Sequence, residues 1–211
     1  MQVIRYFILL TVSIFFGSIS LAQRQVEVGF GVVASGLAVD PLPAAYRSNF
    51  SGPVTYPGYY IEGAVLLFQH EKWKPRALLR FQSEGSNESI DWPQIRLNTA
   101  GIGGSIGYQL SPVISVLGGG IANYQLSSKI VPLPTDQPQL EKGNSLSGRI
   151  NIGVRGDFGR WSSEMIFEKS FTSLSGAVLL SKEGTTSFQP SYSFVNILLG
   201  VKYKLFQSAK T

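Results

Sequence analysis

The clearest pattern in the chain is an alternation of apolar and polar positions near its C-terminal end, over residues 193–206. One face of an extended chain there carries Val195, Ile197, Leu199, Val201, Tyr203 and Leu205. The opposite face is mostly polar and carries Asn196, Lys202 and Lys204. Side chains of a strand point alternately to its two faces. An alternation this long predicts a strand that can cross a bilayer, which takes about 9–11 residues when the strand is tilted.

The same alternation recurs along the chain and predicts eight strands. We expect them over residues 25–35, 59–69, 76–84, 96–110, 113–126, 146–158, 161–171 and 193–206. Long segments rich in turn-forming residues connect some of them, namely residues 36–57, 85–94, 127–145 and 172–190. Short turns connect the others, namely residues 70–75, 111–112 and 159–160. The sequence therefore predicts an all-β fold, an eight-stranded antiparallel up-and-down transmembrane β-barrel, with both termini on the rim of the short turns.

The polar faces of these strands carry charges of both signs. We expect the following residues to form an ion-pair network in the lumen: Glu27, Glu62, Arg76, Arg80, Arg149, Arg155, Asp157, Glu164, Glu168, Lys202 and Lys204. The interior of an eight-stranded barrel is just wide enough for side chains to fill, and buried charges need partners. The alternative is a soluble barrel of the lipocalin kind, in which the apolar faces line the lumen and these charges face water.

Two features favour the membrane protein. Residues 1–22 have the form of a secretory signal peptide, with Arg5 before an apolar run and the small residues Ser20 and Ala22 before the cleavage site. Aromatic residues also gather near the strand ends, as in the two interfacial girdles of membrane barrels. At the long-loop rim we expect Tyr59, Tyr60, Tyr124, Phe171, Tyr192 and Phe194, and at the short-turn rim Trp73, Tyr108, Phe158, Trp161, Tyr203 and Phe206. We expect residues 23–206 to form the barrel and residues 207–211 to form a short tail.

The chain resembles the small eight-stranded outer-membrane β-barrel proteins of the OmpA/OmpX-like type. The resemblance covers residues 25–206 and is most specific in the last strand, where alternating apolar residues end on an aromatic residue. It implies that Val201, Tyr203 and Phe206 form a signal read by the barrel-assembly machinery, although residues 207–211 extend beyond it. It also implies the outer membrane of a Gram-negative bacterium as the location, and membrane lipid as a partner. Roles within this group vary, so the resemblance implies no reaction.

Composition and motifs offer little chemistry. The chain has no cysteine, which excludes disulfides and cysteine-based metal sites. Its net charge of +5 comes without a basic cluster interleaved with aromatics, so we expect no nucleic-acid partner. The glycine-rich run at residues 101–107 has Ile106 where a dinucleotide-binding loop needs glycine, and no helix follows it.

The sequence also gives little support for a set of catalytic residues. The single histidine, His70, lies beside a short turn, away from the long loops. Glu164 and Glu168 share one strand face, but Arg149 and Arg155 on the neighbouring strand favour ion pairs over acid–base catalysis. We therefore expect no enzyme and no cofactor.

Three functions remain open. The favoured one is a structural or surface-interaction barrel, monomeric, whose long loops contact an extracellular ligand while the charged lumen acts as a plug. The second is a narrow, porin-like conduit. The third is a secreted soluble barrel that binds a small apolar ligand.

Overall fold

The computed structural model describes residues 25–40, 54–87, 94–131, 146–171, 179–180, 187–188 and 191–206. The predicted signal peptide, residues 1–22, and the predicted tail, residues 207–211, lie outside these ranges and stay predictions. In the described part of the chain, no helix has the length and apolar character needed to cross a membrane.

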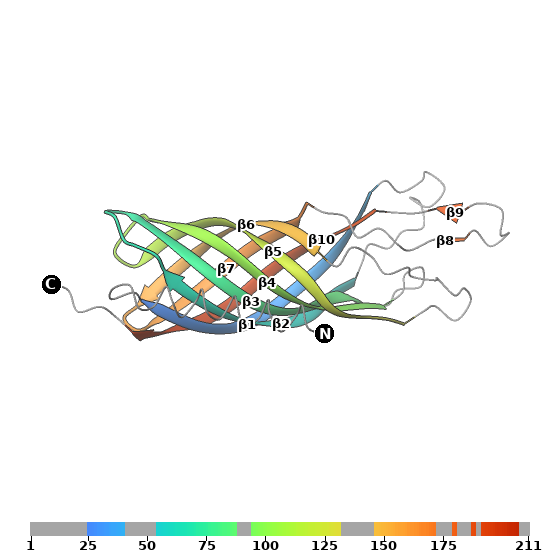
Figure 1. Ribbon diagram of the computed structural model, residues 1–211, viewed down its shortest axis with the longest axis horizontal. Helices are drawn as coiled ribbons and strands as arrows, with labels where there is room; N and C mark the ends of the chain where they lie inside the picture. The colour runs from blue at the N-terminus through green and yellow to red at the C-terminus, as the bar shows by residue number, and fades with distance from the viewer. Residues whose placement is uncertain are drawn as a thin grey trace, which may run out of the picture.

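Eight antiparallel strands form a closed barrel in the order β1-β10-β7-β6-β5-β4-β3-β2 (Figure 1). These strands are β1 (Val26–Asp40), β2 (Val54–Leu66), β3 (Trp73–Asn87), β4 (Gln94–Gln109), β5 (Ile114–Val131), β6 (Leu146–Phe158), β7 (Trp161–Ser170) and β10 (Ser191–Phe206). Each pairs with the next barrel strand in the chain, and β10 pairs with β1 to close the barrel. The predicted all-β, eight-stranded up-and-down barrel is thus confirmed.

The segment at residues 172–190, predicted as a loop, also contains regular structure. Two short strands, β8 (Leu179–Leu180) and β9 (Ser187–Phe188), pair as a separate two-stranded sheet. A strand of two residues is too short to leave an alternating pattern in the sequence.

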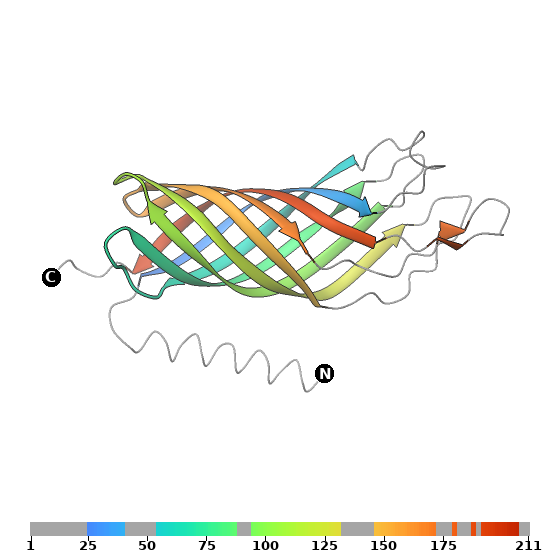
Figure 2. The same ribbon diagram turned by 90° about the horizontal axis from the view of Figure 1, so that it is seen from above.

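The three short turns lie together at one end of the barrel, which we call the turn rim (Figure 2). They comprise residues 67–72, 110–113 and 159–160, and in the last of them Gly159 adopts a positive φ of 64°. The first barrel residue of β1 and the last of β10 pair at this same end. The strands that lead into the long connections end at the opposite end, the loop rim.

Several strands extend further towards the loop rim than predicted, although β6 has the predicted bounds. β1 continues to Asp40 and β5 to Val131, into segments predicted as loops. β2 already begins at Val54 and accommodates Pro57, because the ladder with β3 shifts register between Thr55 and Tyr59. The extension of β5 carries polar residues on both faces, and those of β1 and β2 contain glycine or proline, so alternation does not mark their ends.

The apolar side chains face outwards. In β7, exposed and buried side chains alternate strictly from Trp161 to Ser170. On β6, Ile150, Ile152 and Val154 are 59%, 59% and 44% exposed, whereas Arg149 and Arg155 are 2% and 3% exposed. This orientation is the opposite of that in a soluble barrel whose apolar faces line a ligand cavity.

Of the predicted girdle residues, the structure describes all side chains except those of Tyr192 and Phe206, and it corrects the prediction at two of them. At the turn rim, exposed Trp73 packs against Tyr108 and exposed Trp161 against Tyr203, with ring centroids 4.8 and 4.9 Å apart. At the other end, the prediction that Tyr60 and Phe194 join an outer girdle is wrong, since both are buried in the lumen. Their positions have the same parity as the inward-facing residues next to them in the chain, and this outweighs their aromatic character.

Candidate functional site

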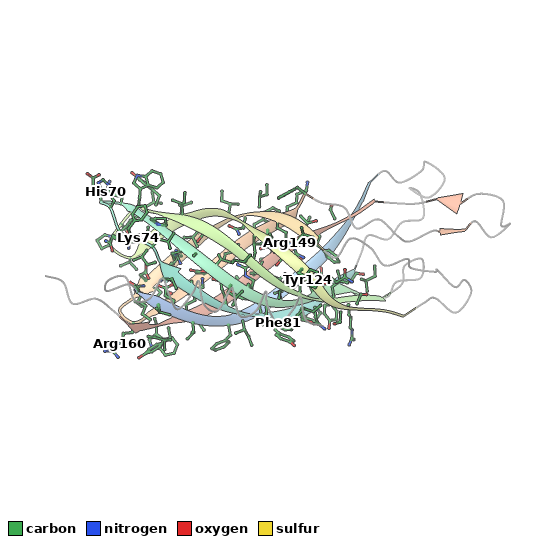
Figure 3. All side chains as sticks on the ribbon, viewed as in Figure 1. His70, Lys74, Phe81, Tyr124, Arg149 and Arg160 are labelled. Carbon is green, nitrogen blue, oxygen red and sulfur yellow. The ribbon has the colours of Figure 1, made fainter. Side chains whose placement is uncertain are left out.

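The lumen is the candidate site, because most of the charged side chains of the barrel strands are buried there, whereas mostly carbon-rich side chains project from the outside of the barrel in Figure 3. Inward positions on β1, β2, β3, β6, β7 and β10 carry the charges, while β4 and β5 contribute uncharged residues there, several of them small. The small residues leave room for long side chains. A Cβ at Gly107 of β4, for example, would lie 3.4 Å from Nη2 of Arg76.

At the turn rim the ion pairs begin with Lys204 and Asp157, 3.0 Å apart. Asp157 contacts Arg155 at 2.9 Å. Arg155 reaches across the lumen to Glu27 of β1 at 2.6 Å and also contacts Glu164 of β7 at 2.9 Å. This end of the lumen therefore joins β1, β6, β7 and β10 through charged side chains.

The middle of the lumen continues from Glu164. Arg76 of β3 contacts Glu164 at 3.0 Å and Glu27 at 3.5 Å. Lys202 of β10 lies 2.8 Å from Glu164 and also pairs with Glu62 of β2. Glu164 thus contacts three cations, because Arg155 lies beside it as well.

The remaining ion pairs lie nearer the loop rim. Arg80 pairs with both Glu62 and Glu168 at 2.7 Å, and Glu168 contacts Arg149 at 3.0 Å. Arg149 also pairs with Glu84. Asn196 donates a hydrogen bond to Glu84 at 2.7 Å. The Glu84 carboxylate therefore has both an amide and a guanidinium as partners.

These contacts form one connected set, which we call the lumen network. It consists of six basic residues, Arg76, Arg80, Arg149, Arg155, Lys202 and Lys204, and six acidic residues, Glu27, Glu62, Glu84, Asp157, Glu164 and Glu168. Its formal charge is zero. All of its members are buried except Asp157, whose side chain is 14% exposed at the turn rim.

The structure brings all eleven charged residues named from the sequence into the lumen network, and it adds one that was missed. Glu84 is fully buried on β3 and pairs with Arg149. The signal was present in the sequence, because Glu84 has the same parity as Arg76 and Arg80. It is the last residue of the predicted strand, next to a predicted polar loop, and it was not included in the predicted network.

Apolar side chains fill part of the lumen beside the network. One cluster contains Val33, Tyr60, Ile166 and Leu198, and another contains Ala64, Leu78 and Ile121. The guanidinium of Arg80 lies 5.4 Å from the centroid of the Tyr60 ring, at a cation–π distance. Tyr60 fits there because Gly31 and Gly200 lack side chains: a Cβ at these positions would lie 2.5 and 2.0 Å from atoms of Tyr60.

The predicted assembly signal lies at the end of β10. Val201 is 39% exposed on the outer face, and the ring of Tyr203 packs against Trp161. The backbone of Phe206 pairs with Val26, so the strand reaches this residue. Recognition by the assembly machinery stays a prediction.

Among the described residues, the groups considered for catalysis lie apart or are held in ion pairs. His70 is exposed in the turn between β2 and β3, where its backbone pairs with Trp73. Glu164 and Glu168 are each held by arginines. Within the described ranges, no three His, Cys, Asp or Glu side chains are grouped so that they could hold a metal ion.

No protein-family model and no curated protein sequence matches this chain. Among solved structures it is similar to Neisserial surface protein A, with 8% sequence identity, a TM-score of 0.54, and coverage of 85% of this chain and 97% of that one. It is also similar to the attachment invasion locus protein Ail of Yersinia pestis, with 10% identity, a TM-score of 0.45, and coverage of 87% of this chain and 100% of that one. A third is the outer membrane protein OprG of Pseudomonas aeruginosa, with 10% identity, a TM-score of 0.46, and coverage of 88% and 97%.

Of these three, the Neisserial protein superimposes closely enough to bear on the fold. Together with the closed barrel of eight strands, the likeness establishes that this chain has the fold of the small eight-stranded outer-membrane β-barrels.

Proposed function

We propose that this chain is an integral protein of the outer membrane of a Gram-negative bacterium, with a structural or surface-interaction role. The observation that carries the proposal is the orientation of the sheet, with apolar side chains outside and a neutral ion-pair network inside. A band of apolar side chains around a closed barrel suits hydrocarbon as its solvent, since no backbone edge is left unpaired. In this proposal residues 1–22 direct export and are then removed.

The lumen network is proposed to act as a plug that holds the barrel rigid. Its ion pairs join strands that are not neighbours in the sheet, such as Arg155 of β6 with Glu27 of β1 and Arg149 of β6 with Glu84 of β3. Charges with several partners and no net excess meet the requirement that buried ions be paired. A rigid barrel is a suitable scaffold for long loops that contact a partner outside the cell.

A closed lumen is favoured over a conduit. The lumen network runs from Lys204 near the turn rim to Glu84, in the half of β3 nearer the loop rim. Apolar clusters pack beside it. The cavity at the turn rim has a volume of about 30 Å³, which is room for one or two water molecules. These features support a barrel without an aqueous pore.

The partners proposed for this protein are the outer-membrane lipid, the barrel-assembly machinery during insertion, and an extracellular ligand of the long loops. The assembly machinery would read Val201, Tyr203 and Phe206 at the end of β10. We propose a monomer without enzymatic activity and without a nucleic-acid partner.

Cell fractionation combined with gel mobility tests the location. The full chain is expressed with its own leader in a Gram-negative host, and membrane fractions are run with and without boiling. We expect the protein in the outer-membrane fraction, with a mobility that changes on heating because the folded barrel resists detergent. Recovery of a soluble periplasmic protein would contradict the proposal.

Single-channel recording in a planar bilayer separates the plug from the conduit. Purified, folded protein is expected to give no stepwise current. Reproducible conductance steps that disappear with heat-denatured protein would favour the conduit instead.

A further inference from the structure

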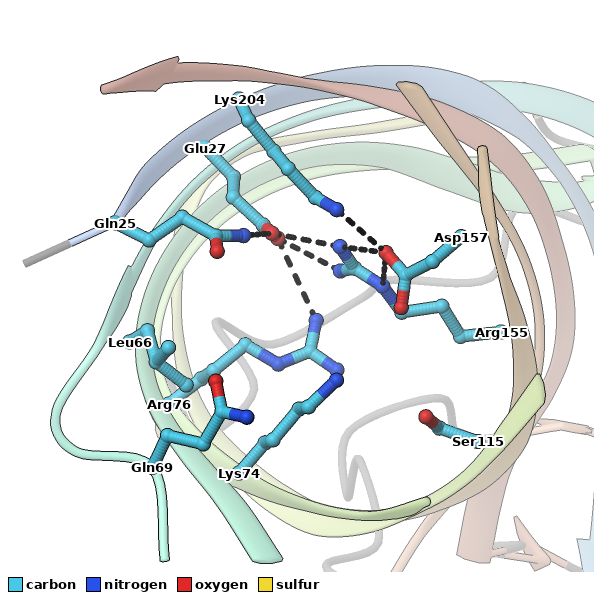
Figure 4. Close-up of a pocket in the computed structure, with 10 residues that line it drawn as sticks. All are labelled: Gln25, Glu27, Leu66, Gln69, Lys74, Arg76, Ser115, Arg155, Asp157 and Lys204. Carbon is cyan, nitrogen blue, oxygen red and sulfur yellow. Dashed lines mark hydrogen bonds and ion pairs between the residues drawn. The ribbon is translucent and has the colours of Figure 1, made fainter. Parts of the chain in front are cut away.

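The lumen ends at the turn rim in a small pocket, shown in Figure 4. We call it the rim pocket, and its lining residues are Gln25, Glu27, Leu66, Gln69, Lys74, Arg76, Ser115, Arg155, Asp157 and Lys204. Gln69 is exposed, so the pocket opens towards solvent at this end of the barrel. Its volume of about 30 Å³ is small, so the pocket suits a compact ion better than a large ligand.

The rim pocket has more positive than negative charge. Four cationic side chains line it, namely Lys74, Arg76, Arg155 and Lys204, against two carboxylates, those of Glu27 and Asp157. Both carboxylates are already engaged by cations: Glu27 by Arg155 and Arg76, and Asp157 by Arg155 and Lys204. Both carboxylates of the pocket are therefore already in ion pairs, and none is left over to pair with the remaining positive charge.

Lys74 is the source of this surplus. Its side chain makes no ion pair or hydrogen bond with any residue in the described part of the chain, and the lumen network is neutral without it. In Figure 4 its side chain extends into the pocket that Arg76, Arg155 and Lys204 also line. Like charges gathered around one small pocket repel each other, and a bound anion would remove this repulsion.

Other donors point into the same space. Arg76 uses Nη1 for its contacts with Glu27 and Glu164, and its Nη2 has no partner among the described residues. Ser115 of β5 is 2% exposed and directs its hydroxyl into the pocket from the opposite wall. An ammonium, a guanidinium and a hydroxyl that converge on one small space form a set of donors for the oxygens of an anion.

We propose that the rim pocket binds a compact tetrahedral oxyanion of the phosphate class, held by Lys74, Arg76 and Ser115. The ion enters from the turn rim and compensates the charge of Lys74, which has no ion pair among the described residues. This site goes beyond the proposed function, because it requires only the folded barrel and not a particular location or loop partner.

Inorganic phosphate is the probe for the test. The folded protein in a neutral detergent is titrated with phosphate by calorimetry, and chloride at equal ionic strength serves as the reference. We compare the wild type with Lys74→Gln and Ser115→Ala, which remove donors inside the pocket. The matched control is Lys72→Gln, because Lys72 is an exposed lysine in the adjacent turn and does not line the pocket. The heat-dependent gel mobility of each variant establishes that it has folded.

Wild type and Lys72→Gln are expected to bind phosphate saturably and in preference to chloride. Lys74→Gln should bind roughly tenfold more weakly or worse, as expected when a charged hydrogen-bond donor is lost. Ser115→Ala keeps the charge and should weaken binding less. Wild-type protein that binds phosphate no better than chloride would overturn the proposal, and so would a folded Lys74→Gln variant with unchanged affinity. Neither result would bear on whether the barrel resides in the outer membrane.

Discussion

Replacing Arg149 by methionine should be among the most destabilising single changes in the lumen. Arg149 pairs with Glu168 and Glu84, and both carboxylates are fully buried. Glu168 keeps Arg80 as a partner, but Glu84 has no other cation among the described residues. Breaking a buried pair in this way costs about 3–5 kcal/mol, because a carboxylate is left buried without compensation. If the same pair were hydrated, the cost would be about 0–1 kcal/mol.

A second substitution separates the lost charge from the lost packing. Arg149→Met combined with Glu84→Gln removes both charges and restores a neutral lumen. We expect the double variant to be more stable than Arg149→Met alone by about 2 kcal/mol, because it no longer buries a carboxylate that has lost its cation. The matched control is Arg160→Met, since Arg160 is an exposed arginine at the turn rim and such changes usually stay within about 0.5 kcal/mol.

The assay is reversible urea unfolding of the folded barrel in lipid vesicles, followed by tryptophan fluorescence. Stabilities are compared from the midpoints at equal slopes. The reasoning would be refuted if Arg149→Met lost no more stability than Arg160→Met, or if the added Glu84→Gln change gave no recovery. Either result would mean that the lumen is wet enough to solvate a lone carboxylate.

Three further predictions address the outer face, the apolar cluster and the end of the chain. Ile152→Arg, in the middle of the outer face of β6, should cost about 2–4 kcal/mol in the same vesicle assay, whereas Leu146→Arg at the loop rim should cost about 0–1 kcal/mol; equal costs would argue against a bilayer around this face. Tyr60→Phe removes a buried hydroxyl that has no partner among the described residues, so stability should stay constant or rise by about 1 kcal/mol, and a clear loss would show that the hydroxyl is bonded. Phe206→Ala should reduce the amount of heat-modifiable barrel in cells while removal of residues 207–211 should not, and the reverse result would place the assembly signal in the tail.

The sequence pattern was sufficient for the fold because each strand buries one face and exposes the other. β6 shows this best, since its alternation is unbroken and its bounds were predicted correctly. The pattern fails where both faces are polar, as in the extension of β5 to Val131. An expectation based on residue type failed where it disagreed with the alternation. Tyr60 and Phe194 occupy inward positions of their strands and face inwards, although aromatic residues are common in outer girdles.

The inward charges could be predicted from parity, but their partners could not. Arg155 pairs with Glu27, which is 128 residues away in the chain. Which charges meet across the lumen depends on the stagger of all eight strands, and alternation within one strand carries no information about that stagger. The rim pocket was missed for the same reason, because Lys74 of β3 and Ser115 of β5 lie on either side of β4 and their relative height depends on the stagger of these strands.

The location proposed for this barrel requires its apolar outer face to meet hydrocarbon. Nitroxide scanning of β6 tests this most directly. The chain contains no cysteine, so single cysteines at Ile150, Ile152 and Val154 can be labelled and compared with one at Arg160 in the turn. The barrel is reconstituted in lipid vesicles, and the collision rates of each label with oxygen and with a water-soluble nickel chelate are measured. If the outer face meets hydrocarbon, oxygen, which concentrates in lipid, reaches the three β6 labels while the chelate reaches only the label at Arg160. If the chelate reaches the β6 labels as readily as the label at Arg160, the outer face meets water instead.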